Sequence, residues 1–446
     1  MAQSRPEPNI LAFPAASRVS PSGGVAEAGA LQLGALLAGP YVARLMVSDF
    51  RCYERAALET DPRPVVLTGP NGAGKTNLLE ALSFLAPGRG LRQARLAEVD
   101  RRRPAPPGGV PGGGVPGGGV PGGVPAGEAR SWAVAARLGG PAGECDIGTG
   151  RDPAAEEGTR DRRLLRIDGT SYRGLNGLAE RLAVLWLTPQ MDGLFLDSKS
   201  ARRRFLDRLV LCFDPGHAGR LNAYEQAASE RMRLLRGEML AGEGRNQAAW
   251  LDALEQQIAE KGVAIAAARL DLTARLGAVL GATEGSFPRP GLALLGEVES
   301  WLGEMPALAA EDRMRARLAA GRTLDAEAGR AHLGPHKSDL LVSFGSGGGA
   351  VGMPAADCST GEQKALLIAI LLGQARLMAA ERGRPPLLLL DEIAAHLDDG
   401  RRRALFDALL ELGIQAWLTG TDRGLFAALG EQAQYFTVSD ARITRN

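Results

Sequence analysis

The chain has 446 residues, of which 45% are hydrophobic and 23% are charged, so it is long enough for about two to three domains with buried cores. Its 52 Lys and Arg residues nearly balance its 51 Asp and Glu residues, and the net charge is +1. This balance excludes a globally basic coat for nucleic acid, so any binding to DNA must use local patches.

The cysteines and the hydropathy pattern indicate the compartment. The four cysteines are far apart and form no CxxC pair, which argues against a zinc site or a disulfide framework and favours a reducing cytoplasm. No apolar run reaches the roughly 18 residues of a membrane span. The mildly apolar stretch 28–39 lacks a preceding basic run, so it does not match a signal peptide. We therefore expect a cytoplasmic protein with no membrane partner.

The first half of the chain alternates strand-like and low-complexity segments. Residues 1–40 are rich in Ala, Gly, Pro and Ser, and this composition predicts a disordered N-terminal extension. Strand-like runs follow at 41–50 and 65–69. Residues 104–127 contain only Pro, Ala, Gly and Val and predict a flexible surface insertion. Short strand-like pieces return between residues 129 and 190.

The second half begins with a helical, amphipathic region from about residue 200 to 282. Gly242 and Gly244 interrupt its longest stretch, which predicts two antiparallel helices of ordinary length and excludes a long coiled-coil arm. The part after residue 330 alternates strand and helix, and this alternation predicts a parallel sheet covered by helices. Its expected elements are strands at 340–344, 386–391 and 414–419 and helices at 361–381 and 400–412.

A glycine-rich motif follows the strand-like run at 65–69 and opens a predicted helix. It matches G-x-x-x-x-G-K-[ST], and its residues are Gly69, Pro70, Asn71, Gly72, Ala73, Gly74, Lys75 and Thr76. Backbone N–H groups of such a loop wrap phosphates, and the following helix N-terminus adds a positive dipole. Lys75, one of only five lysines in the chain, is a point charge for the β- and γ-phosphates, and the Thr76 hydroxyl is a Mg²⁺ ligand. The motif predicts that the chain binds ATP with Mg²⁺.

Four leucines and two acids form the second motif, Pro386–Glu392. A buried parallel strand delivers such carboxylates to its C-terminal edge, where α/β proteins bind ligands. Asp391 is expected to hold Mg²⁺ through water, and Glu392 to orient or deprotonate the attacking water. Lys75, Asp391 and Glu392 are thus the candidate catalytic residues.

The third motif, Cys358–Lys364, precedes a long apolar helix. Taken alone, Ser359 and Glu362 match an ordinary helix N-cap with a capping box. The order of phosphate loop, Ser-x-Gly helix start and acidic strand is that of an ABC-type ATPase, in which the serine turn contacts the γ-phosphate held by another subunit. ATP would then join two copies head to head.

Two further features leave alternatives open. Lys75 and Asp391 are 316 residues apart, which implies that an extra lobe interrupts the ATPase core. We expect lobe I to comprise residues 41–197 and 331–446, and a helical lobe II to comprise 198–330. An arginine cluster on the first helix of lobe II is either a solvated helix face or a site for DNA phosphates; its members are Arg202, Arg203, Arg204 and Arg208. His332 and His336 have no third ligand nearby, which favours a structural turn over a metal site.

Beyond these motifs, the chain resembles the RecF family of bacterial recombination-mediator ATPases, which is related to SMC-type heads. The resemblance runs from about Tyr41 to the end, apart from 104–127, and is most specific in the segments RRRFLD, GPHKSD and STGEQK. It implies an α/β fold: an ABC/SMC-type P-loop ATPase head, with a mixed sheet and helices, an inserted helical lobe and no long coiled coil.

The resemblance also implies roles for single residues. Arg51 would lie near the nucleotide. Gln190 would occupy the Q-loop, which couples the γ-phosphate and Mg²⁺ to the helical lobe, and Asp192 competes for that role. Thr421 would take the switch position, where transporters have a histidine. The implied subunit interface, which includes the D-loop aspartate, comprises Ser359, Gly361, Gln363 and Asp398.

The function implied by the resemblance is that of a weak, DNA-stimulated ATPase. ATP would close a homodimer on DNA at gaps or at junctions of single- and double-stranded DNA, and slow hydrolysis would release it. The partners implied are RecR and RecO, which together help RecA displace single-strand-binding protein. The alternatives are an ABC-type ATPase coupled to another load, such as a transporter, and a non-catalytic module with a decayed site. The missing switch histidine argues against the first alternative, and intact Lys75, Asp391 and Glu392 argue against the second.

Overall fold

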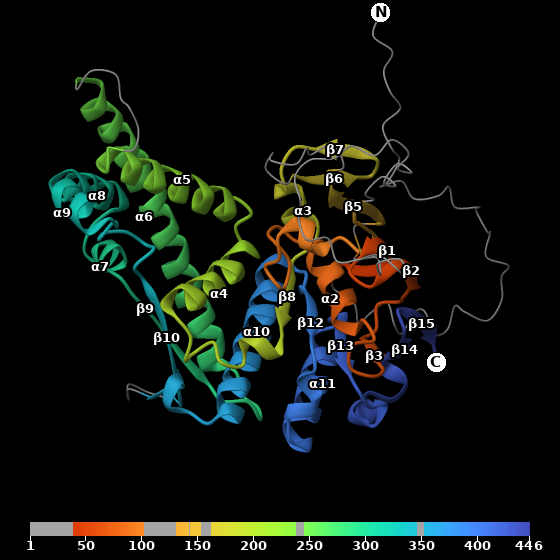
Figure 1. Ribbon diagram of the computed structural model, residues 1–446. Coiled ribbons are helices and arrows are strands. Elements are labelled where there is room, and N and C mark those ends of the chain that lie inside the picture. Colours follow the sequence, from red (N-terminus) through yellow and green to blue (C-terminus); the bar gives the residue numbers. More distant parts are fainter. Residues whose placement is uncertain (1–38, 102–130, 142, 153–161, 238–244, 346–351) are drawn as a thin grey trace, which may run out of the picture.

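The computed structural model describes residues 39–101, 131–141, 143–152, 162–237, 245–345 and 352–446. The expected insertion at 104–127 and nearly all of the expected N-terminal extension lie outside these ranges. Two six-stranded sheets, one three-stranded sheet and a group of helices make up the described part of the chain (Figure 1).

The first sheet is antiparallel, with the strand order β2-β1-β4-β5-β6-β7. Strands β1 and β4 bury most of the side chains that this sheet contributes to the core, whereas β2 and β7 are mostly exposed. Their bounds are β1 (Tyr41–Phe50), β2 (Tyr53–Glu59), β4 (Ala133–Gly139), β5 (Cys145–Arg151), β6 (Arg163–Ile167) and β7 (Thr170–Tyr172). A tight turn joins β1 to β2, and Arg51 in this turn has a φ of 54°.

The second sheet has the order β15-β14-β3-β13-β12-β8, and all of its neighbours are parallel except β14 and β15. Its central strands are short, apolar and buried throughout, which is typical of a parallel sheet covered on both faces. The bounds are β3 (Val65–Thr68), β8 (Val184–Leu187), β12 (Leu387–Leu390), β13 (Ala416–Gly420), β14 (Gln434–Ser439) and β15 (Arg442–Arg445). The predicted parallel sheet is confirmed.

Helix α2 (Lys75–Ser83) lies between the two sheets. Its Leu78 and Leu82 are fully buried in one apolar cluster with Leu45 of the first sheet and Trp417 of the second. The short elements η1 (Leu96–Val99) and α3 (Asn176–Arg181) border this layer. The helix that follows the phosphate loop is therefore held from both sides.

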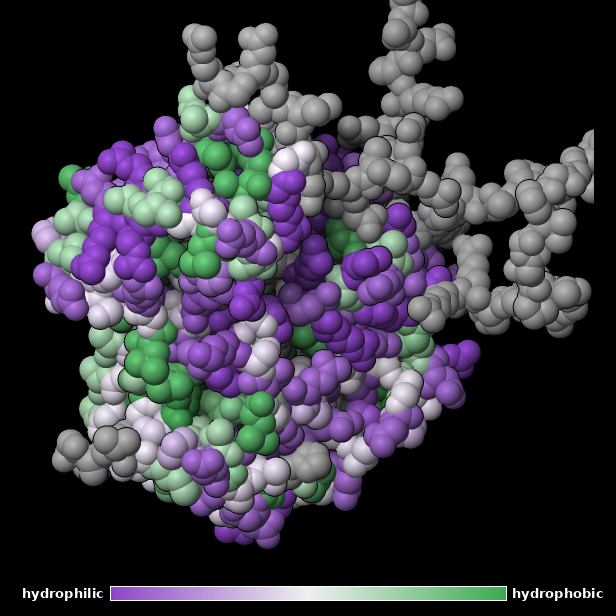
Figure 2. Space-filling model, turned by 60° about the vertical axis from the view of Figure 1, so that its left-hand side comes forward, coloured by the Kyte–Doolittle hydropathy of each residue, from purple (hydrophilic) through white to green (hydrophobic). Residues whose placement is uncertain are grey.

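The other face of the parallel sheet is covered by helices. They are α4 (Lys199–Leu211), α10 (Thr360–Arg382), α11 (Asp399–Glu411), η4 (Ile393–His396) and η5 (Arg423–Gln432). Helix α10 is long and apolar enough to cross a membrane, but 83% of its most apolar window is buried inside the protein. Helix α10 is therefore the central core helix of this layer. The face of the molecule shown in Figure 2 is mainly hydrophilic, with separate hydrophobic patches.

The helical lobe is built on α5 (His217–Leu235) and α6 (Arg245–Ala282), with α7 (Glu297–Glu304), α8 (Ala307–Ala320) and α9 (Arg322–Ala328) packed around them. The sequence predicts a break near Gly242, and α5 does end before it and α6 begins after it. The expectation of ordinary lengths is wrong for α6, which has 38 residues and is about 57 Å long at 1.5 Å per residue. Its C-terminal half packs with the helices over the parallel sheet, so α6 joins the two lobes.

A small sheet in the order β11-β10-β9 crosses the expected lobe boundary. Strand β9 (Pro290–Leu295) pairs along its whole length with β10 (Asp339–Phe344), and β11 (Met353–Pro354) follows. The expected division at residue 330 therefore separates two strands of one sheet. The reason is that β9 has only six residues between helices, so its strand character is weak in the sequence.

Buried ion pairs hold the helical lobe together. Asp207 of α4 accepts hydrogen bonds from Arg269 of α6 (2.8 Å to each oxygen) and lies 2.8 Å from His217 of α5. His332 contacts Asp325 and His336 contacts Tyr224, and no cluster of metal-ligating side chains occurs among the described residues. The structural interpretation of the two histidines fits these contacts.

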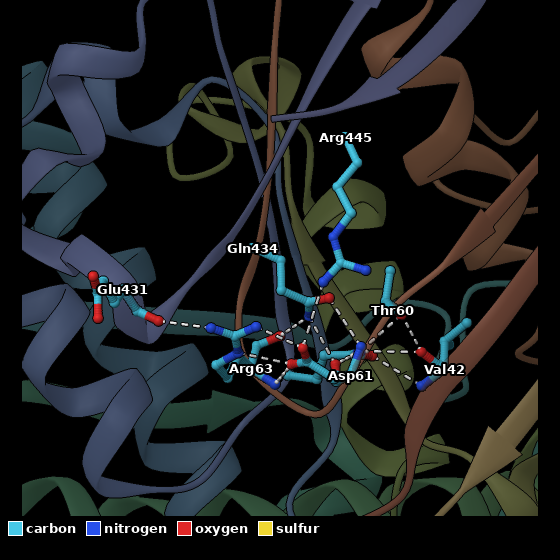
Figure 3. Close-up of polar contacts among 8 residues, drawn as sticks. Val42, Thr60, Asp61, Arg63, Glu431, Gln434 and Arg445 are labelled. Carbon is cyan, nitrogen blue, oxygen red and sulfur yellow. Dashed lines mark hydrogen bonds and ion pairs between the residues drawn. The ribbon is translucent and has the colours of Figure 1, made fainter. Parts of the chain in front are cut away.

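The loop between β2 and β3 is tied to both sheets (Figure 3). Gln434 of β14 accepts the N–H of Asp61 (2.9 Å) and donates to the carbonyls of Asp61 (2.9 Å) and Arg63 (3.1 Å). The Arg63 guanidinium pairs with the Asp61 carboxylate (2.7 Å) and donates to the carbonyl of Glu431 (2.7 Å). Gln415 makes the matching bonds to Val42 of β1 (2.9 Å). These contacts set the antiparallel sheet against the edge of the parallel sheet.

Candidate nucleotide site

The phosphate loop connects β3 to α2, and three of its glycines have left-handed backbone angles. Gly69 (φ 147°) and Gly74 (φ 114°) have no room for a side chain, because a Cβ would meet the Val438 carbonyl and the Tyr53 hydroxyl respectively. At Gly72 (φ 81°) a Cβ would meet no atom within 4 Å. The loop is thus packed against the protein on one side and open on the other, as a phosphate cradle requires.

Lys75 is the first residue of α2, and its side chain turns back over the loop. Its Nζ donates to the carbonyls of Gly69 (2.7 Å) and Pro70 (2.9 Å), and only 4% of the residue is exposed. Burial lowers the pKa of Lys75, and the nearby carboxylates of Glu392 and Asp391 partly oppose that effect. The ammonium group therefore lies against the first residues of the phosphate loop, near the carboxylates of Asp391 and Glu392.

The acidic strand end meets the phosphate loop directly. Asp391, at the end of β12, accepts hydrogen bonds from the Thr76 hydroxyl at 2.9 and 3.1 Å to its two oxygens. These residues are more than 300 positions apart in the sequence and are brought together because β12 lies next but one to β3 in the sheet. A hydroxyl beside a carboxylate at this point is the oxygen ligand set that Mg²⁺ prefers.

No sequence motif marked Thr419, which bonds to the Asp391 carboxylate and to the backbone of Glu392. Its hydroxyl, 1% exposed on β13, donates to Asp391 Oδ1 (2.8 Å) and accepts the N–H of Glu392 (2.9 Å). Glu392 has a left-handed φ of 53°, so this bond supports an uncommon backbone conformation. The residue expected at the switch position, Thr421, is exposed at the surface. In the sequence, Thr419 is marked only as a hydroxyl residue near the end of an apolar strand, two positions before Thr421.

Arg51 lies against the helix of the phosphate loop. Its guanidinium forms a two-pronged ion pair with Glu80 of α2 (2.6 and 2.9 Å) and donates to the Glu98 carbonyl (2.7 Å). Arg92 contacts the same Glu80 carboxylate (2.9 Å). In this structure the Arg51 donors thus hold α2 in place.

The Q-loop candidates lie in the 3-10 turn η2 (Pro189–Met191), which follows β8. Gln190 is exposed. Asp192, the residue after the turn, has its carboxylate 2.9 Å from the ammonium of Lys364 in α10. The two candidates are therefore separated: Gln190 is at the surface, and Asp192 contacts the long core helix.

The third motif forms the start of α10 as a capping box. The Ser359 hydroxyl accepts the N–H of Glu362, and the Glu362 carboxylate accepts the N–H of Ser359 (2.8 Å). Ser359 and Gly361 are exposed, and a Cβ on Gly361 would meet no atom within 4 Å. Asp398, also exposed, accepts the N–H of Arg401 (2.8 Å) at the start of α11.

Gln363 requires a correction. It was expected at a subunit interface, but only 2% of the residue is exposed, and its amide donates to the Cys358 carbonyl (2.9 Å). The helical period explains the difference, because Gln363 lies on the face of α10 that packs into the core, opposite to Gly361. Its side chain is not on the surface of the subunit.

All four members of the arginine cluster of α4 make contacts inside the subunit. Arg202 forms a two-pronged pair with Asp339 (2.8 and 2.9 Å), and Arg203 donates to the Ser338 carbonyl (2.6 Å). Arg208 lies over the Trp186 ring at 4.4 Å, and burial lowers its pKa to about 10. Only Arg204 is exposed. These contacts attach α4 to its neighbours and favour the structural interpretation of the cluster, and a role in binding DNA phosphates stays a prediction.

Comparisons with known proteins place the chain in a family. A family model described as an AAA domain, putative AbiEii toxin, type IV TA system, matches residues 65–123. The DNA replication and repair protein RecF of Allorhizobium ampelinum is 46% identical over 406 residues, which cover 91% of this chain and 98% of the relative. The RecF protein of Rhizobium meliloti matches equally well. This chain belongs to the RecF family. A solved structure of the recombination mediator protein RecF, described as RecF-ATP in the RecFOR pathway, has a TM-score of 0.72 at 19% identity over 92% of this chain and 98% of that one, so the RecF fold is shared.

The residues of this RecF-family chain fit a nucleotide with its metal ion. The open side of the loop at Gly72 leaves space for phosphates, and the N–H groups at the start of α2 and the Lys75 ammonium supply positive charge there. Thr76 and Asp391 supply the oxygens for Mg²⁺, and Glu392 adjoins them. When bound, Mg²⁺ would neutralise charge on the phosphate oxygens during transfer to water.

Proposed function

We propose that this chain is an ATP-dependent DNA-binding protein of recombinational repair. ATP and Mg²⁺ close a homodimer over DNA at gaps or at junctions of single- and double-stranded DNA, and slow, DNA-stimulated hydrolysis releases it. Together with RecO and RecR, it assists the loading of RecA in the cytoplasm. The observation that carries the proposal is the contact of Thr76 with Asp391, which joins the phosphate loop and the acidic strand end in one site.

Within one subunit, each residue has a distinct task. The loop N–H groups and Lys75 bind the phosphates, and Lys75 gives up its bonds to the Gly69 and Pro70 carbonyls to do so. Asp391, oriented by Thr76 and Thr419, would hold Mg²⁺ through water. Glu392 accepts the proton of the attacking water, and its backbone is held by Thr419.

The proposed homodimer is supported by the exposed start of α10. Glycine within a helix costs about 1 kcal/mol relative to alanine, and no atom of this subunit excludes a side chain at Gly361. A requirement for close approach by another molecule would account for the glycine. The N-terminus of α10, with Ser359 exposed, favours an anion there. A γ-phosphate held by a second copy satisfies both conditions, and Asp398 would face the same copy.

Binding to DNA is tested by fluorescence anisotropy of a labelled gapped duplex, with and without ATP and Mg²⁺. We expect tighter binding with ATP and an affinity that falls steeply with salt, because the contacts are mainly to phosphates. Lys75→Met should lose the ATP effect, whereas Lys337→Met, which changes an exposed lysine outside the site, should keep it. An affinity that does not change with salt or ATP would contradict the proposal, and rapid hydrolysis without any DNA effect would favour an ATPase with another load.

A further inference from the structure

A buried ion pair joins α10 to the turn that follows β8. The ammonium of Lys364 lies 2.9 Å from Asp192 Oδ2, and the two side chains are 4% and 32% exposed. A lysine removed from water to this extent requires a partner, because an unpaired buried charge is strongly destabilising. The contact is therefore a stable part of the folded subunit.

The two ends of this pair belong to different parts of the proposed machinery. Lys364 is in the first turns of α10, the same helical segment that presents Ser359 and Gly361 at the surface. Asp192 comes two residues after Gln190 and closes the turn η2, with its N–H bonded to the Pro189 carbonyl (3.1 Å). The ion pair is thus a direct link between the turn after β8 and the surface offered to a second copy.

The turn is also linked to the nucleotide site through the backbone. The N–H of Asp391 donates to the carbonyl of Leu187, the last residue of β8, at 2.9 Å. On its other side the turn contacts α4, because Arg208 of α4 donates to Met191 Sδ (3.6 Å) and lies over the ring of Trp186 of β8. A displacement at the end of β8 therefore reaches α4 and α10 together.

The polar groups around the pair are not all satisfied. Asp192 Oδ1 and Gln363 Oε1 are buried, and no described residue donates a hydrogen bond to either. Buried acceptors without donors are uncommon in folded proteins. A second arrangement of the turn would lose no hydrogen bond at these two atoms.

We propose that the Lys364–Asp192 pair couples the nucleotide site of one subunit to the surface that it offers to a second copy. A shift of the turn moves Asp192, the ion pair moves Lys364, and α10 carries the Ser359–Gly361 turn with it. Both are positioning residues and need not touch the nucleotide. The inference rests on the proposed ATP-dependent dimer and names the residues that regulate it.

The test compares wild type with Lys364→Met, Asp192→Asn and the double variant. Two quantities are measured: the affinity of the single subunit for a fluorescent ATP analogue, and the dimerisation constant in ATP and Mg²⁺ by sedimentation. Lys199→Met, which changes a lysine that is 65% exposed on α4, is the matched control. Thermal unfolding shows that each variant folds. The double variant replaces the ion pair by two neutral side chains and leaves no buried charge unpaired. Its dimerisation constant therefore tests the inference if either single variant does not fold.

We expect Lys364→Met to bind the analogue within about threefold of wild type, and both single variants to dimerise about tenfold more weakly than wild type in ATP. The double variant should be no weaker than the single variants, because all three remove the same interaction. Folded variants that dimerise as strongly as wild type would overturn the inference, because the pair would then only stabilise the subunit. The proposed function would still stand. A wild-type protein that stays monomeric in ATP would overturn both.

Discussion

Replacing Thr419 by valine tests whether one hydroxyl supports both acids of the site. The substitution keeps the shape of a side chain that is 1% exposed but removes its donor and its acceptor. Asp391 loses a 2.8 Å bond and the N–H of Glu392 loses a 2.9 Å bond. A hydrogen bond to a charged group contributes about 1.5–3 kcal/mol, and a stranded buried N–H costs about 1–3 kcal/mol. Because Thr76 still bonds to Asp391, we expect the low part of the summed range, a loss of about 2.5–4 kcal/mol in the free energy of unfolding.

The assay is urea unfolding followed by tryptophan fluorescence, since the fully buried Trp417 lies on the same strand as Thr419. Thr421→Val is the matched control, because Thr421 is exposed two residues further on, and an exposed change of this kind stays within about 0.5 kcal/mol of wild type. Thr419→Ser should recover most of the loss. Equal unfolding free energies for Thr419→Val and Thr421→Val would refute the reasoning.

Three further changes separate binding, assembly and stability. Lys75→Met should weaken ATP affinity at least about tenfold, because it removes the charge at the mouth of the loop; a titration with a fluorescent ATP analogue that gives the wild-type constant would count against this. Gly361→Ala should leave subunit stability unchanged or raised by up to about 1 kcal/mol, since no atom lies near, but weaken the ATP-dependent dimer, as light scattering would show. Burial acts to raise the pKa of Asp207, but hydrogen bonds from His217 and Arg269 outweigh it and hold the pKa below its ordinary value. The stability that Asp207 contributes is therefore present above the unfolded pKa of about 3.9 and is lost as pH falls through the folded pKa. Asp207→Asn removes the carboxylate that pairs with Arg269, so it should lower the free energy of unfolding by about 3–5 kcal/mol at pH 7. The stability of this variant should also change less than that of wild type as the pH falls. Urea midpoints from pH 7 to pH 3 that match wild type would contradict this prediction.

The phosphate loop and the acidic strand end could be located from the sequence because their motifs are local. The loop from Gly69 to Thr76 contains its own glycines, lysine and hydroxyl, and the strand before Asp391 is too apolar to be anything but buried. The alternation of strands and helices after residue 330 predicted the parallel sheet for the same reason. Such features are encoded over a few consecutive residues.

What the sequence did not predict depends on contacts between distant segments. Thr419 acts on Asp391 only because β13 lies beside β12. The partners of the α4 arginines are equally hidden in the sequence, since Arg202 bonds to Asp339 across 137 positions. The family resemblance implied an interface role for Gln363, whereas the helical turn directs its side chain into the core. Charge and position in the sequence do not reveal which side of an element a residue occupies.

The central claim is that two copies complete one site around ATP. Light scattering of the purified protein, with ATP, Mg²⁺ and a short gapped duplex and with none of them, tests it most directly. The account predicts a mass that doubles when ATP and Mg²⁺ are added, a shift strengthened by the duplex, and no shift for Ser359→Arg, which places a bulky cation at the exposed start of α10. A protein that remains a monomer while it hydrolyses ATP rapidly would contradict the account.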